Sequence, residues 1–297
     1  MVAYNSSLSN ISGDVPQPSL KRTIYRMNAG LERLYARAGH LSDRFTVLDF
    51  DPVIDQSKII ETFGSKAQDA SPTRVLCYSY LLEFAKEKLE PECEIVDLGC
   101  GFGHYSQHLK KLLNCSAYLG FDIERRDAWK GYENERAVFR TAELGKEKID
   151  IGHARNIFSQ SVLEHVHHDC RIFDLFGCDA PVTLKHLHLV PAPMSYFETR
   201  YHGFRRYGIR ELTRLLSHPG FQNITITPLG NAVSREFHAL QHGKRSAVAR
   251  MKKTGANGAY DLNASALENM DARGAEFKCE DLRDASFFAI SFDQVVT

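Results

Sequence analysis

The sequence lacks a charge excess, a long apolar run and a secretory leader. Lys and Arg together number 37, as do Asp and Glu, so no net field favours nucleic acid, an anionic membrane or an acidic substrate. The N-terminal stretch has no apolar core of the kind that a secretory signal needs, and no uncharged apolar run reaches the roughly 18 residues of a membrane-spanning helix. We therefore expect a cytoplasmic protein with no membrane and no nucleic acid among its partners.

Closely spaced cysteines are also missing. The chain has seven cysteines, an odd number, with no CxxC pair of the kind that holds zinc or forms a redox disulfide. We expect reduced thiols, as is usual for cytosolic proteins, and no metal site. The cysteines are Cys77, Cys93, Cys100, Cys115, Cys170, Cys178 and Cys279.

The length of 297 residues suits one large domain with additions. Residues 1–22 are rich in Ser, Asn and Pro without periodicity, which predicts a disordered tail. Residues 23–70 are expected to form a helical lid or brace over the main domain. Within them, IYRMNAGLERLYARAG is an amphipathic helix pattern. Its apolar stripe consists of Ile24, Met27, Leu31, Leu34 and Tyr35.

The main domain is expected over residues 71–297. Ser71 can cap a helix whose first position is Pro72. After this helix, short apolar strand patterns alternate with helical patterns, which predicts an α/β fold with a mostly parallel sheet and helices on both faces. The strand patterns are EIVDL, SAYLGFDI, ARNIFSQSV, HLHLVPAP, QNITITPL and ASFFAISF. A mostly helical insertion, residues 231–283, separates the last two.

Three alternating glycines follow the first of these strands. In DLGCGFG, Gly99, Gly101 and Gly103 precede a helical pattern, so backbone N–H groups can approach a ligand at a helix N-terminus. A dinucleotide fold requires GxGxxG, whereas this loop is GxGxG with Asp97 two residues earlier. An acid there repels a pyrophosphate but can attract an amino group. Asp122, about twenty residues downstream, is placed to accept the hydroxyls of a ribose.

With these residues, the chain resembles the class I S-adenosylmethionine-dependent methyltransferases, particularly the small-molecule group similar to the ubiquinone-biosynthesis type enzymes. The resemblance rests on DLGCGFG, GFDIE, TAEL and SQSVLEHV. It implies a Rossmann-like sheet of seven strands, one of them antiparallel near the end, with S-adenosylmethionine bound across the carboxyl ends of the first strands. The implied cofactor contacts are Asp97, Gly99, Cys100, Gly101, Gly103, Asp122, Ile123, Ala142, Glu143, Ser159 and Gln160.

The same resemblance suggests residues near the acceptor. His165 and His202 are candidate general bases, and Arg205, Arg206 and Tyr207 are candidate substrate contacts over the site mouth. Some members of the ubiquinone type hold a divalent metal with an extra acid three residues before the glutamate. That position is Ser161 here, so we expect no metal.

The predicted function is methyl transfer to an O or N atom of a small-molecule acceptor, a metabolite or a sugar-like compound. Enzymes that methylate base amino groups usually carry a proline-containing tetrad after the fourth strand, and IFSQSV contains no proline. Two alternatives stay open. One is a Rossmann-type NAD(P) oxidoreductase, which the glycine spacing and Asp97 disfavour. The other is a non-catalytic binding protein on a methyltransferase fold.

Overall fold

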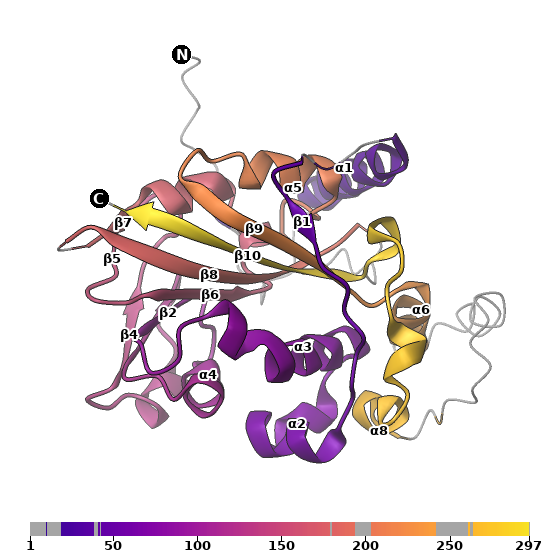
Figure 1. The fold of residues 1–297 in the computed structure, drawn as a ribbon, viewed down its shortest axis with the longest axis horizontal. Coiled ribbons are helices and arrows are strands. Elements are labelled where there is room, and N and C mark those ends of the chain that lie inside the picture. The colour runs from indigo at the N-terminus through magenta and orange to yellow at the C-terminus, as the bar shows by residue number, and fades with distance from the viewer. Residues whose placement is uncertain are drawn as a thin grey trace.

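A single eight-stranded sheet organises the chain (Figure 1). The computed structural model describes residues 10, 19–38, 41, 43–178, 180–193, 203–241, 261 and 264–296. The strand order is β1-β9-β10-β8-β6-β2-β3-β4. These strands are β1 (Thr46–Val47), β2 (Ile95–Leu98), β3 (Tyr118–Asp122), β4 (Ala137–Thr141), β6 (Asn156–Gln160), β8 (Val182–Pro191), β9 (Phe221–Leu229) and β10 (Phe287–Val296). Two short strands, β5 (Ile149–Asp150) and β7 (Phe176–Gly177), pair separately.

The strand directions confirm the expected α/β fold. β2 pairs in parallel with β3 and β6, and β6 pairs in parallel with β8. β10 is antiparallel to both β8 and β9, and it is the antiparallel strand that the resemblance implied. The structure adds an eighth strand, because β1 of the N-terminal segment pairs in parallel with β9. The β4 strand had no place in the sequence prediction.

Helices cover both faces of the sheet (Figure 1). The helices are α1 (Ser19–Ala38), α2 (Gln56–Phe63), α3 (Pro72–Lys88), α4 (Tyr105–Leu113), α5 (Ile209–Leu216), α6 (Ala232–Gln241) and α8 (Ala266–Met270). The short 3-10 turns are η1 (Ser65–Asp69), η2 (Asp127–Gly131), η3 (Leu163–His165), η4 (Asp169–Asp174), η5 (Gly274–Phe277) and η6 (Leu282–Asp284). One apolar cluster joins α2, α3, α4 and α6 to the sheet, and a second packs α5 and η4 against the other face.

The α3 helix forms where its sequence signals predicted. The Ser71 side chain accepts a hydrogen bond from the Arg74 N–H, and Pro72 occupies the first turn. Leu76, Tyr80 and Leu81 are fully buried. Because α3 contacts α4, α6 and α8, it is the central helix of its face.

The N-terminal segment differs from its prediction. The α1 helix begins at Ser19, inside the expected tail, and it packs on α5 with the side chains of Tyr25 and Glu32, which are 3% and 1% exposed. Four residues of its predicted apolar stripe face outward instead: Met27 is 63%, Leu31 45%, Leu34 64% and Tyr35 51% exposed. The side chain of Ile24, the fifth, lies outside the described residues. Among the helices that the structure describes, none combines the length and apolarity needed to cross a membrane.

The insertion at residues 231–283 contributes α6, α8, η5 and η6, with 242–260 and 262–263 outside the described residues. It packs against residues 54–56. The Gln56 N–H donates to the Asp271 carboxylate, and the Ala272 N–H donates to the Ile54 carbonyl. The insertion therefore supports the segment that leads into α2.

Candidate functional site

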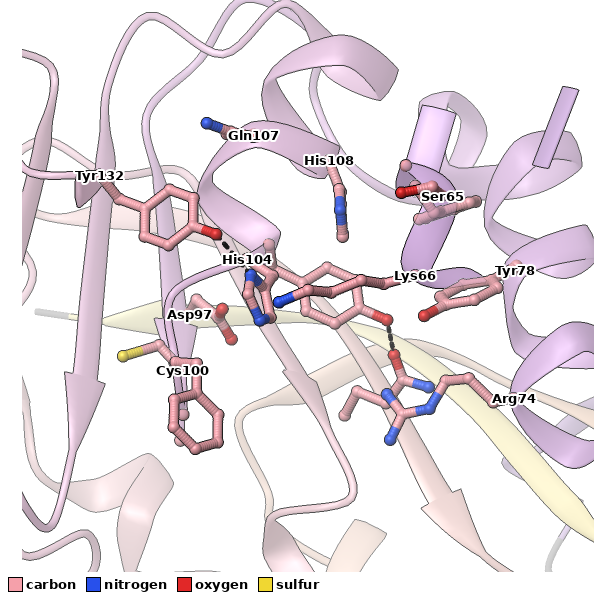
Figure 2. Close-up of a pocket in the computed structure, with 17 residues that line it drawn as sticks. Ser65, Lys66, Arg74, Tyr78, Asp97, Cys100, His104, Gln107, His108 and Tyr132 are labelled. Atoms are coloured by element: carbon pink, nitrogen blue, oxygen red, sulfur yellow. Dashed lines mark hydrogen bonds between the residues drawn. The ribbon is translucent and has the colours of Figure 1, made fainter. Parts of the chain in front are cut away.

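A cavity of about 410 Å³ opens at the carboxyl end of β2 (Figure 2). The loop after β2 forms one wall, and the turn from α2 into η1 forms the opposite one. Side chains of α3 and α4 complete it. The lining residues are Phe63, Gly64, Ser65, Lys66, Arg74, Tyr78, Asp97, Gly99, Cys100, Gly101, Phe102, His104, Tyr105, Gln107, His108, Tyr132 and Gln160.

Different constraints require glycine at the three positions of the loop. All have positive φ, at 69°, 54° and 84° for Gly99, Gly101 and Gly103, where a Cβ is strained. A Cβ on Gly99 would also lie 2.4 Å from Val162, and one on Gly103 would lie 2.7 Å from Phe139. A Cβ on Gly101 would meet nothing within 4 Å. Gly101 is thus the position where the bare backbone borders open space.

Asp97 supplies the carboxylate of the cavity. Its side chain is 2% exposed, and its Oδ2 accepts a hydrogen bond from the Tyr118 hydroxyl at 2.6 Å. Burial raises the pKa of Asp97 to about 7, against the hydrogen bond from Tyr118, which lowers it. A cationic ligand group beside Asp97 would favour its charged form.

Asp122 and Trp129 hold the glycine loop from behind. The Gly101 N–H donates to Oδ2 of Asp122 at 2.8 Å, and the indole N–H of Trp129 donates to the Gly101 carbonyl at 2.7 Å. Asp122 ends β3, and the fully buried Trp129 stacks on Phe139 of β4. Two neighbouring strands therefore fix the orientation of the loop peptide.

The wall opposite the loop carries positive charge and phenols. Arg74 and Tyr78 come from α3, and the Lys66 side chain extends from η1 toward His104 (Figure 2). Arg74 interacts electrostatically with Tyr105, Tyr78 and Cys77. It also interacts with the buried Glu164 carboxylate, whose pKa burial raises to about 7 against the charges of Arg206 and Arg74. The Tyr105 hydroxyl donates to the Gln160 carbonyl oxygen. The cavity therefore offers cations for an anionic ligand group and Asp97 for a cationic one.

The cavity histidines are uncharged at neutral pH. Burial, and then the charge of Lys66, lower the pKa of His104. Burial, followed by His104 and Lys111, lowers the pKa of His108 to about 4. His104 Nδ1 lies 2.6 Å from the Tyr132 hydroxyl, so these rings contribute hydrogen bonds and apolar surface.

The residues expected at the adenine lie outside the cavity lining. Ile123 is 37% exposed after β3, and the Ala142 N–H donates to the Asp122 carbonyl. Glu143 binds Lys146 at 2.7 Å and accepts the Asn10 N–H at 3.2 Å. The hydrogen bond from Lys146 is the main cause of its lowered pKa. The described residue of the expected tail, Asn10, thus contacts this edge.

Some of the remaining predicted contacts line the cavity and others do not. The backbone N–H of Cys100 donates to the Phe121 carbonyl, and Cys100 and Gln160 line the cavity. Ser159 does not line it, because its hydroxyl lies on the other side of β6, 2.8 Å from His188 Nδ1. His165 also lies away from the lining, with Nε2 3.9 Å from Glu164. His202 is outside the described residues.

The predicted substrate residues Arg205, Arg206 and Tyr207 make contacts within the fold. Arg205 lies 3.0 Å from the buried Asp169, and the Tyr207 hydroxyl donates to the same carboxylate at 2.8 Å. The Arg206 guanidinium donates to the Tyr25 hydroxyl of α1. None of the three lines the cavity. Because Asp169 is fully buried, its charge is compensated by these groups and Arg214.

Several cavity residues were absent from the sequence prediction. Arg74 and Tyr78 had a usable signal, since positions four apart on the capped helix share one face. Lys66 and Tyr132 had none, because they come from separate turns. Tyr118 and Trp129, which do not line the cavity but bind Asp97 and the Gly101 carbonyl, had none either. Within the part of the chain that is described, no group of three or more His, Cys, Asp or Glu side chains could hold a metal ion.

No family model matches the sequence, and a search of curated proteins finds no relative. Among solved structures, the chain is similar to phosphoethanolamine N-methyltransferase 2 of Haemonchus contortus, a structure with phosphomonomethylethanolamine and S-adenosylhomocysteine. That pair has 11% identity and a TM-score of 0.41, covering 82% of this chain and 61% of the other. A methyltransferase of Archaeoglobus fulgidus has 14% identity and a TM-score of 0.42, over 81% and 100%. The cyclase SpnF has 12% identity and a TM-score of 0.41, over 94% and 98%. These likenesses concern the fold, and the neighbours differ in reaction.

Proposed function

We propose that the chain is an S-adenosylmethionine-dependent methyltransferase that methylates an O or N atom of a small-molecule acceptor. The observation that carries the proposal is the bare backbone of Gly101, which borders open space in a cavity containing the buried Asp97 carboxylate. Asp122 is attached to the same loop by its hydrogen bond to the Gly101 N–H. A tight backbone approach flanked by two acids suits a ligand with an amino group and a ribose.

The donor groups fit the two charges of an amino-acid end. Asp97 would hold the ammonium, and Arg74 would hold the carboxylate as a charge-assisted hydrogen-bond donor. Asp122 would meet the ribose, with Ile123 and Glu143 beside the adenine. The bound cofactor supplies a methyl group on a sulfonium, which is activated toward displacement. The protein's part is to align the acceptor and exclude water.

The polar and aromatic lining suits a small acceptor. Lys66, Tyr78, His104 and Tyr132 offer hydrogen bonds around the open side of the cavity, and His165 and His202 remain the proposed sources of a base. A pyrophosphate would lie against Asp97, which disfavours the NAD(P) alternative. A non-catalytic binding protein would bind the cofactor without methylating any acceptor.

Calorimetry with S-adenosylhomocysteine tests the cofactor proposal. Asp97→Asn and Asp122→Asn should each weaken binding by about 1 to 3 kcal/mol, the loss of a charge-assisted contact. Asp150→Asn is the matched control, because the Asp150 side chain is 74% exposed on the separate strand β5. Wild-type affinity should rise as pH increases through about 7, where Asp97 loses its proton, and Asp97→Asn should remove that rise. Unchanged affinity in both site variants would contradict the assignment.

Activity is a separate measurement. Transfer of a labelled methyl group to a panel of small hydroxyl and amine compounds should occur with the wild type and fall in Asp97→Asn. Tight cofactor binding with no labelled product across the panel would instead favour a binding protein. NADH binding without S-adenosylhomocysteine binding would favour the oxidoreductase.

A further inference from the structure

The α1 helix has its polar and apolar faces reversed relative to the domain. The face toward α5 is polar: the buried Glu32 carboxylate pairs with Arg210, and the Tyr25 hydroxyl accepts a hydrogen bond from Arg206. A surface helix normally turns its apolar stripe to the core. Here the stripe is the solvent-facing side, so core packing does not explain it.

The outward stripe follows one side of the helix, and the Ile24 side chain lies outside the described residues. Leu20, Met27, Leu31, Leu34 and Tyr35 are 71%, 63%, 45%, 64% and 51% exposed. From Leu20 to Leu34 the stripe extends for about 21 Å at 1.5 Å per residue. Large apolar side chains exposed in one row mark an interaction surface.

The charge of α1 indicates what kind of surface the stripe binds. Its sequence, SLKRTIYRMNAGLERLYARA, contains five basic residues and one acidic residue. The acid is Glu32, which is 1% exposed and compensated by Arg210. A helix with an apolar stripe and a strong basic excess binds at anionic lipid interfaces. The neutral net charge of the whole chain hides this local excess.

We propose that α1 is an interfacial helix that docks the protein on an anionic membrane surface. A flat surface needs only the outward stripe, so α1 can stay attached to α5 through Tyr25 and Glu32 while its apolar side chains enter the headgroup region. A second copy of the chain is disfavoured, because it would bring two strongly basic helices together. The proposal replaces the sequence-based expectation of no membrane partner and is independent of the proposed methyl transfer.

Vesicle flotation of the full chain tests the proposal. Phosphatidylcholine vesicles containing phosphatidylserine should bind the protein at least about tenfold more strongly than pure phosphatidylcholine, and added salt should weaken binding. The double variant Leu31→Ser with Leu34→Ser should lose about tenfold or more in affinity for the anionic vesicles. Val138→Ser is the matched control, since Val138 is 42% exposed on β4, at the sheet edge opposite β1. Melting temperatures would show that each variant is folded.

Fluorescence gives a second readout of the same docking. Leu34→Trp should shift its emission to shorter wavelength with anionic vesicles, and Val138→Trp should not, while the native Trp129 is fully buried in both. Equal vesicle binding by wild type and the double serine variant would overturn the proposal. So would no binding at all, or a dimer in sedimentation that the double variant dissociates, which would assign the stripe to self-association.

Discussion

Gly99 and Gly101 are two residues apart and share a left-handed backbone, yet their surroundings differ. A side chain on Gly99 would strike Val162 in the turn after β6, whereas one on Gly101 would enter open space. The first glycine lets two loops pack together. The second presents its bare Cα to the cavity, while Asp122 and Trp129 bind its N–H and carbonyl. The same residue type therefore serves packing at one position and binding at the next.

Alanine substitutions separate these two roles. Gly101→Ala should cost about 1 to 2 kcal/mol of unfolding free energy, from left-handed strain alone. Gly99→Ala should cost about 1 to 3 kcal/mol more, because overpacking against Val162 adds to the same strain. Only Gly101→Ala should lose more affinity for S-adenosylhomocysteine than its stability loss explains. Urea unfolding and calorimetry measure both quantities, and wild-type affinity in Gly101→Ala would show that no ligand approaches there.

At the level of elements, the cavity depends on contacts between distant parts of the chain. The η1 wall follows a segment that packs on the insertion, where Gly274 approaches Pro52 so closely that a Cβ would lie 1.6 Å from the Pro52 carbonyl oxygen. The Pro52 carbonyl is part of the backbone, so it cannot move aside as the end of a flexible side chain could. The insertion, although remote from the cofactor loop, therefore helps to hold η1 in place.

Gly274→Ala should loosen this contact. We expect a loss of about 2 to 4 kcal/mol in unfolding free energy, typical of a severe backbone clash, and weaker S-adenosylhomocysteine binding. Gly131→Ala is the control, because its Cβ would meet nothing within 4 Å and its φ is not positive. Urea unfolding and calorimetry again apply. If Gly274→Ala is as stable as Gly131→Ala, the insertion does not support the segment before α2.

At the scale of the whole molecule, a chain of buried polar groups links β6 to β8 and stacks on β10. The Ser159 hydroxyl on β6 lies 2.8 Å from His188 Nδ1 on β8, and His188 Nε2 lies 3.2 Å from His186 Nδ1. Both rings are fully buried, and His186 stacks on Phe292 of β10. Burial lowers the pKa of His188 to about 3 and that of His186 well below its usual value. The sheet interior therefore holds both rings neutral.

The stability of the fold should reflect these rings in acid. Below the unfolded pKa of about 6.5, the unfolded state takes up a proton that native His188 refuses, so this contribution to stability falls by about 1.4 kcal/mol per pH unit. Asp97 and Glu164, whose pKa values burial raises to about 7, act in the opposite direction. Because these groups oppose one another, the effect of His188 is best measured as the difference in unfolding free energy between His188→Gln and the wild type.

The stability of His188→Gln relative to wild type should increase as pH falls from about 6.5 toward 5. Urea unfolding at several pH values measures this difference. His153→Gln, at an exposed position, should show no such trend. A difference that is constant with pH for His188→Gln would mean that His188 titrates normally in the folded protein.

The sequence by itself determined the features that neighbouring residues encode. The Ser71 cap, the left-handed glycines after β2 and the alternating strands occupy the positions that their local patterns predicted. Asp97 lines the cavity, and Asp122 binds the glycine loop without lining the cavity. Turn conformation, capping and strand periodicity depend on a few adjacent residues, so short patterns suffice to place them.

Only the tertiary structure decided which side chains from distant parts of the chain contact one another. It assigned Arg205 and Tyr207 to the buried Asp169, brought Lys66 and Arg74 to the cavity, and turned the apolar stripe of α1 outward. Each outcome depends on which partner satisfies a charge or covers an apolar face. Periodicity shows that a helix has two faces, but only the residues packed against it, here Arg206 and Arg210, determine which face is buried.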